Sequence, residues 1–113
     1  MKRRHYPYPT TTISTNITLS TNNTHCGNIV VTNGATLIIT AELTMNPAAK
    51  ITVQNGGVLI VNGGSIVNAK IDVLSSAKIQ LLNNGTLYLK QLGNLSIQLG
   101  SEANLDYGRV LIE

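Results

Sequence analysis

The chain has little of what most compact folds use. Of its 113 residues none is Phe or Trp, one is Cys, and only 12% are charged. A single cysteine excludes an internal disulfide and a cysteine-rich zinc site. No apolar run reaches the roughly 18 residues of a membrane-spanning helix, and the N-terminal MKRRHYPYPT has no apolar stretch of a secretory signal behind it. We therefore expect a piece of a longer protein, or a chain that starts after a removed leader.

Polar, uncharged residues take the place of the missing charge. The chain has 13 Asn, 13 Thr and 10 Gly among many Ile, Val and Leu, which favours strands and turns over helices. The net charge of +3 comes from Lys2, Arg3 and Arg4, since the remainder carries five basic and five acidic residues. A neutral body argues against nucleic acid as a partner.

An internal repeat is the strongest pattern. The repeated unit is a pair of apolar residues with one residue between them, then a five-residue turn, then a second such pair. It occurs four times, at spacings of 22, 20 and 26 residues. The pairs are Ile29/Val31 with Leu37/Ile39, Ile51/Val53 with Leu59/Val61, Ile71/Val73 with Ile79/Leu81, and Ile97/Leu99 with Leu105/Tyr107. The pattern predicts an all-β protein, a parallel β-solenoid of about four coils of 20–26 residues, after a degenerate first coil at Ile17/Leu19.

The repeat also gives a domain organisation. Residues 1–12, with alternating Tyr and Pro, are predicted to be an extended N-terminal arm, and residues 13–113 a single solenoid domain. A third strand in each coil is predicted at Leu43/Met45, Val67, Leu87/Leu89 and Val110/Ile112. An insertion is expected around residues 82–94.

The turns predict how the corners are held. Asn33, Asn55 and Ser75 hold equivalent turn positions, so we expect them to line up, with Asn55 bonding between coils. A small residue two positions later (Ala35, Gly57, Ala77 or Ala103) leaves room where the corner is crowded.

Other arrangements stay open at this point. Residues 47–61 also match residues 75–89 at an offset of 28, although that register leaves Ile71 and Val73 unexplained. An antiparallel β-sandwich with Asn-Gly hairpins is the main alternative fold. Right-handed coiling is expected because β-crossovers are usually right-handed.

Residues with catalytic or metal-binding chemistry are scarce. The repeat sets Asp72 level with Gln98 and Gln80 level with Asp106, so it pairs no two acids between coils, as a hydrolase would require. His25 and Cys26 are adjacent and would point to opposite faces of a strand, and Cys26 is expected to be a small buried residue. We predict no catalytic residues, no metal site and no cofactor.

Two sets of outward residues are candidates for contact with other molecules. Tyr88, Gln80 and Asn62 are possible sugar contacts on a lateral strand face. The other set, Val30, Ile38 and Ile60, is apolar at solvent positions, so we expect the N-terminal arm or a second subunit to cover it.

The segment GNIVVTNGATLIITAELTMNPAAKITVQNGGVLIVNGG, residues 27–64, resembles β-solenoid segments of large secreted or surface-sorted proteins of Bacteroidetes. Those segments look like G-x-I-x-V-x-x-G-A-T-L-x-I, and a looser version continues here to about residue 99. Relatives often carry a Trp where this chain has His25-Cys26, and the sorting domain that usually ends them is missing here. The resemblance implies an extracellular or cell-surface, non-catalytic spacer or adhesive module, and it brings no ligand residues with it.

Three functions follow as hypotheses. The first is a structural or surface-display module of a larger secreted protein, in contact with the other domains of that protein. The second is a carbohydrate-binding module that takes surface glycans, and the third is a fragment of a polysaccharide-degrading β-helix enzyme. We also expect self-association through the solenoid ends or the Ile38/Ile60 face, with charges at Glu102, Asp106, Arg109 and Glu113 discouraging it at the C-terminal end.

Overall fold

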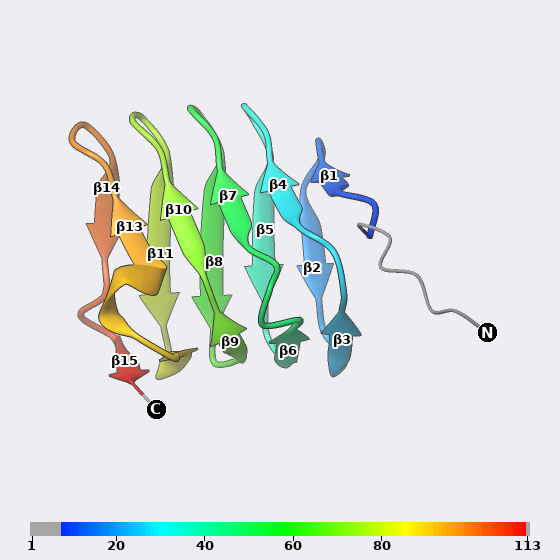
Figure 1. Ribbon diagram of the computed structural model, residues 1–113. Coiled ribbons are helices and arrows are strands. Elements are labelled where there is room, and N and C mark those ends of the chain that lie inside the picture. Colours follow the sequence, from blue (N-terminus) through cyan, green and yellow to red (C-terminus); the bar gives the residue numbers. More distant parts are fainter. Residues whose placement is uncertain (1–7, 113) are drawn as a thin grey trace.

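The computed structural model describes residues 8–112, and it is a parallel β-solenoid of five coils (Figure 1). Each coil contributes one short strand to each of three five-stranded parallel sheets. The predicted fold class is confirmed, including the degenerate first coil. The antiparallel sandwich is excluded because every strand pair of residues 8–112 is parallel.

The three sheets, named A, B and C here, follow one another along each coil. Sheet A consists of β1 (Thr11–Ile13), β4 (Ile29–Val31), β7 (Ile51–Val53), β10 (Ile71–Val73) and β13 (Leu95–Ile97). Sheet B consists of β2 (Ile17–Leu19), β5 (Thr36–Ile39), β8 (Val58–Asn62), β11 (Lys78–Leu82) and β14 (Glu102–Asn104). Sheet C consists of β3 (Asn23–His25), β6 (Glu42–Met45), β9 (Ser65–Ala69), β12 (Gly85–Leu89) and β15 (Gly108–Ile112), and a 3-10 turn, η1 (Leu92–Asn94), precedes β13.

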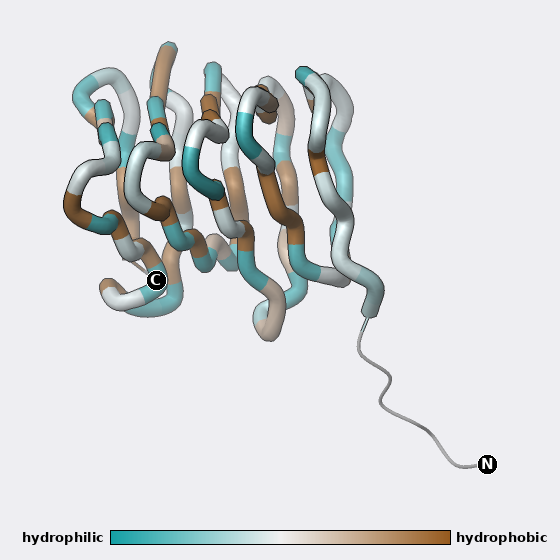
Figure 2. Tube along the Cα trace, turned by 90° about the horizontal axis from the view of Figure 1, so that it is seen from above, coloured by the Kyte–Doolittle hydropathy of each residue, from teal (hydrophilic) through white to brown (hydrophobic). Residues whose placement is uncertain are grey.

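Aliphatic residues stack on one another through the middle of the solenoid. Leu37 pairs with Leu59 and Leu59 with Ile79, and all three side chains are fully buried. Ile51 and Val53 of sheet A are buried to the same degree. The hydropathy pattern repeats from coil to coil in Figure 2. The offset of 20 residues between Ile51 and Ile71 confirms the preferred register and excludes the offset of 28.

The corner between sheets A and B is held by a backbone ladder. The N–H of Gly34 donates to the carbonyl of Gly56, Gly56 to Ser76, and Ser76 to Gly100, at 2.9–3.1 Å. All four residues have positive φ, between 63° and 89°, which suits Gly and costs Ser a strained backbone. Ala35 and Ala77 are buried beneath this corner, as the small-residue pattern predicts.

The expected side-chain ladder is only partly present. Ser75 Oγ donates to the carbonyl of Leu99 at 2.8 Å, which joins two coils. No hydrogen bond of the Asn55 side chain links coils within residues 8–112, and the residue with positive φ is the neighbouring Gly56. The prediction for Asn55 is therefore wrong, because the glycine after it turns the chain and backbone groups join the coils.

The first coil uses asparagine side chains in place of backbone. Asn16, Asn22 and Asn28 each precede a strand. Their Oδ1 atoms accept the N–H of Thr36, Glu42 and Lys50 in the next coil, at 3.1, 3.0 and 2.9 Å. These side-chain carbonyls satisfy backbone donors that lie at or just before the start of strands of the second and third coils.

The third strands differ from the prediction at one position. Ile66 is the buried residue of β9, and it pairs with Leu43 and Leu87, whereas Val67 is half-buried and faces outward. Asn68 is an extra residue with φ of 58°, so the pairing passes from Val67 to Ala69. This bulge made the apolar spacing misleading. The sequence predicts an insertion around residues 82–94. The extra residues lie at the end of this range, at η1, because β12 still pairs with β9.

The last coil is two residues out of step with the prediction. Leu95 and Ile97, rather than Ile97 and Leu99, lie beneath Ile71 and Val73. Alternating apolar residues at 95, 97 and 99 fit either register, and the positive-φ position decides, because Gly100 must lie opposite Ser76. Leu99 therefore lies in the corner and is 95% exposed.

The described part of the N-terminal arm lies against the connection between β3 and β4. A Cβ on Gly27 would collide with the carbonyl oxygen of Pro9. Strand β1 begins at Thr11, so the last two residues of the range predicted to be an arm belong to the first coil. Residues 1–7 lie outside the described residues.

The stacked core predicts a large effect of one truncation. Leu59→Ala removes a fully buried side chain between Leu37 and Ile79, and should lower the free energy of unfolding by about 2–5 kcal/mol. Urea denaturation measures it. The matched control is Ile60→Ala, one residue along the same strand and half-buried, which should cost clearly less. Equal losses would contradict the stacked core.

A second prediction concerns close backbone approach. A Cβ on Gly85 would collide with the backbone carbonyl of Val61 in the third coil. Gly85→Ala should therefore lower the free energy of unfolding by about 1–3 kcal/mol. Nothing surrounds the Cβ position of Gly93, and Gly93→Ala should change stability by less than about 0.5 kcal/mol. Thermal melts of both variants test the spacing of the coils, and a stable Gly85→Ala would contradict it.

Candidate functional site

The three predicted sugar contacts do not share one face. Gln80 lies in the outward row of sheet B and Tyr88 in the outward row of sheet C. Asn62 ends β8 at the corner between these sheets, where its Oδ1 accepts a hydrogen bond from Nδ2 of Asn83 at 2.6 Å. The structure therefore brings Asn62 to a corner and separates Gln80 from Tyr88.

The predicted apolar patch is divided in the same way. Ile38 pairs directly with Ile60 on the outer side of sheet B, and both side chains are half-buried. Val30 lies on sheet A, also half-buried. Tyr8 and Pro9 pass beside Gly27, at the corner between sheets C and A, so the described part of the arm does not cover Ile38 and Ile60.

The register changes which residues lie level with the acids of the body. Asp72 lies level with Ser96, and Gln80 with Asn104, so the equivalences predicted with Gln98 and Asp106 are wrong by the same two-residue shift as the last coil. Within residues 8–112 no group of three His, Cys, Asp or Glu residues is placed to hold a metal ion.

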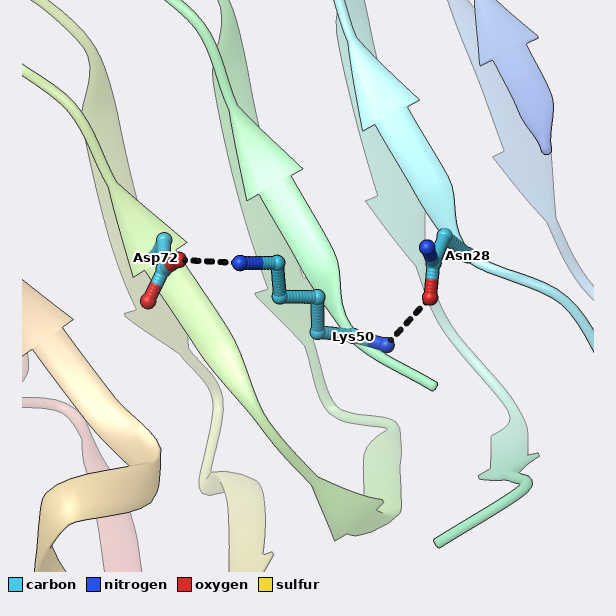
Figure 3. Close-up of polar contacts among 3 residues, drawn as sticks. All are labelled: Asn28, Lys50 and Asp72. Atoms are coloured by element: carbon cyan, nitrogen blue, oxygen red, sulfur yellow. Dashed lines mark hydrogen bonds and ion pairs between the residues drawn. The ribbon is translucent and has the colours of Figure 1, made fainter. Parts of the chain in front are cut away.

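Asp72 instead belongs to a row of contacts across three coils (Figure 3). The Lys50 backbone N–H donates to Oδ1 of Asn28 at 2.9 Å, and its Nζ lies 2.9 Å from Oδ2 of Asp72. The Lys50 and Asp72 side chains are 44% and 34% exposed, so water screens the ion pair. These contacts join neighbouring coils at the surface of the solenoid, and we name them the Lys50 clamp.

The expectation that Cys26 is buried is wrong. Cys26 is exposed, because it lies in the corner after β3 rather than in a strand. Within the described chain, Nε2 of His25 is buried without a hydrogen-bond partner. His25 lies level with the buried Met45 and so holds an inward position, whereas Cys26 lies at the surface.

The last coil presents an uncovered apolar surface. Most of the strongly exposed large hydrophobic side chains of residues 8–112 belong to η1 or to the last coil. Ile97 is 41% exposed and Ile112 54%, although both occupy inward positions that are buried in earlier coils. We name this surface the C-terminal face. Its inward residues are Leu95, Ile97, Ala103, Leu105, Val110 and Ile112.

An open pocket of about 580 Å³ lies at the corner between sheets B and C of the last two coils. We name it the corner pocket, and it is lined by Leu82, Asn83, Asn84, Asp106, Tyr107, Gly108 and Arg109. The two loops are joined by the Asn84 N–H, which donates to the carbonyl of Tyr107 at 2.8 Å. It is a concave surface with several polar side chains, and its lining lies within the described residues.

Sequence reasoning missed this pocket. It assigned Tyr107 to an inward position, whereas the side chain is 66% exposed. The signal that was available is the Asn-Asn-Gly turn at residues 83–85, where two residues with φ of 50° and 65° hold an unusual corner. The two loops are 22 residues or more apart along the chain, so only the correct register of the last coil brings them together.

Comparisons with known proteins add no identity to this geometry. No protein-family model matches the chain, and neither a curated protein nor a solved structure matches it. In the described part of the chain no helix is long and apolar enough to cross a membrane. The resemblance drawn from the sequence therefore holds as far as a β-solenoid of five coils.

The Lys50 clamp gives a prediction with two matched changes. Asp72→Asn should change the free energy of unfolding by less than about 1 kcal/mol, and the difference should shrink in about 1 M salt. Asn28→Ala removes the acceptor of a backbone N–H and should cost about 0.5–1.5 kcal/mol at either salt concentration. Urea denaturation at low and high salt measures both. A large salt-independent loss for Asp72→Asn would show that the pair does more than clamp the surface.

Proposed function

We propose that the chain is a non-catalytic structural module, a β-solenoid segment of a larger secreted or cell-surface protein. In this proposal its C-terminal face stacks on a further β-coil. The observation that carries the proposal is the difference between its two ends. The resemblance to surface-sorted β-solenoid segments supports the location, and the other domains of such a protein are the expected partners.

The first coil has the composition of a cap. Three of its six inward positions are polar (Thr11, Asn23 and His25), and three are apolar (Ile13, Ile17 and Leu19). Stacked-repeat proteins stay soluble when a terminal repeat presents a polar outer face. A first coil that is half polar on its inward side is therefore closer to a cap than the last coil.

The last coil has the composition of an interior coil. Its inward residues are all apolar and continue the aliphatic stacks of sheets A, B and C. The same register also leaves the backbone groups on the outer side of β13, β14 and β15 without a neighbouring strand, as sheet edges do. A further coil with aliphatic residues at two-residue spacing satisfies both requirements at once.

The placement of the carboxylates within residues 8–112 supports the non-catalytic part of the proposal. Asp72 is paired with Lys50, and Glu102 and Asp106 are exposed at the last coil. General acid–base chemistry requires two groups that converge on a substrate. A fragment of a polysaccharide-degrading enzyme is therefore the less favoured hypothesis.

A duplicated coil tests the stacking proposal. Ile112 is the register partner of Leu89, so a second copy of residues 90–112 placed directly after Ile112 continues the solenoid in step. The added coil should fold on the C-terminal face, raise the free energy of unfolding, and raise the urea m value by roughly a fifth, since m scales with the surface exposed on unfolding.

The control carries Asp at the copied positions of Leu95, Ile97 and Val110. This control should have the stability of the original chain, and limited proteolysis should remove its extra segment. If the unmodified copy is also cleaved and leaves the m value unchanged, the C-terminal face is not a stacking surface and the proposal fails.

A further inference from the structure

We propose that the corner pocket binds a neutral saccharide, with Tyr107 as the platform for a sugar ring. The proposal is independent of the stacking proposal, because it concerns the side of the last two coils and not their end. It also differs from the sugar contacts expected on a lateral strand face. The argument rests on the side chains that line the pocket, their charges and the contacts that hold its two loops.

The lining combines one aromatic ring with planar polar groups. Tyr107 is 66% exposed, so much of its side chain is free to meet a ligand. Asn83, Asn84, Asp106 and Arg109 line the same pocket. Amide, carboxylate and guanidinium groups offer fixed donors and acceptors in pairs, which suit neighbouring hydroxyl groups. A sugar ring presents apolar C–H groups on its face and hydroxyls at its edge, and it matches this mixture.

The charges select against strongly ionic ligands. Asp106 and Arg109 carry one charge of each sign, and the other lining residues are neutral. A phosphate or a polyanion needs a surplus of positive charge that the pocket does not offer. Both charged groups can still donate to or accept from hydroxyls, so the pocket favours an uncharged, hydroxyl-rich ligand.

The walls of the pocket are held before any ligand arrives. The backbone N–H of Asn84 donates to the Tyr107 carbonyl at 2.8 Å, and Oγ of Thr86 donates to the Asn84 carbonyl at 2.9 Å. Nδ2 of Asn83 donates to Oδ1 of Asn62 in the third coil at 2.6 Å. Strained residues such as Asn83 and Asn84 persist where surrounding contacts fix them, and fixed walls reduce the entropy lost on binding.

Glycan binding by the full chain tests the proposal. The first probe is an array of neutral and acidic oligosaccharides, and the best neutral sugar is then titrated by NMR or calorimetry. Tyr107→Ala should weaken binding at least tenfold, and Asp106→Ala should weaken it as well. Neither change should lower the melting temperature appreciably, because both side chains are exposed.

Tyr88→Ala is the matched control. Tyr88 is a tyrosine of the neighbouring fourth coil, but it lies in the outward row of sheet C and does not line the pocket. Affinity that survives in Tyr88→Ala and is lost in Tyr107→Ala supports the proposal. Three results would overturn it: no binding of any neutral sugar, binding of acidic sugars alone, or a loss of affinity in Tyr88→Ala that equals the loss in Tyr107→Ala.

Discussion

Hydrogen bonds between the backbones of successive coils set the position of every side chain in this molecule. Parallel pairing in register brings each inward residue over its equivalent in the next coil, as with Leu37, Leu59 and Ile79. A shift of one residue would turn every inward side chain outward. The core, the Lys50 clamp and the corner pocket all depend on that register, because each joins residues that only the ladder brings together.

The same ladder makes the two ends of the solenoid chemically different. Pairing satisfies each interior coil on both sides, whereas an end coil must meet solvent with one side. The first coil places polar residues at three of its six inward positions, and its Asn16, Asn22 and Asn28 side chains bond to the second coil. The last coil keeps an apolar interior. The proposed stacking role follows from this contrast, and the proposed saccharide site follows from loops that the last two coils share.

The sequence predicted the architecture well because the inward residues follow a simple rule. Ile51/Val53 and Leu59/Val61 repeat at the spacing of a strand and a fixed turn, and their stacking needs no knowledge of distant contacts. The rule failed where apolar spacing was ambiguous. Residues 95, 97 and 99 alternate through two possible registers, and Asn68 adds a bulge that no apolar pattern reveals.

The candidate site was beyond the reach of the same rule. The corner pocket joins Asn83 and Asn84 to Asp106, Tyr107 and Arg109, and an error of two residues in the last coil moved Tyr107 to the interior. Sites formed by neighbouring corners depend on the backbone conformation of each turn. Positive φ at non-glycine residues such as Asn83 is set by the contacts of the folded chain as much as by residue type.

The connections at different corners of the solenoid differ in how much their length varies, and this bears on how related sequences can diverge. Five residues separate the inward positions of sheets A and B in the second to fifth coils: 32–36, 54–58, 74–78 and 98–102. The backbone ladder through Gly34, Gly56, Ser76 and Gly100 needs equal lengths there. Between sheets C and A the connections are 26–28, 46–50, 70 and 90–94, so their lengths differ. The coils are still joined at the end of these connections, where the carbonyls of Asn28, Lys50 and Lys70 accept backbone N–H groups of the preceding coil. Insertions and deletions can therefore accumulate along one edge of the solenoid while the opposite corner keeps the coils in step, so this edge is where homologous solenoids would diverge first.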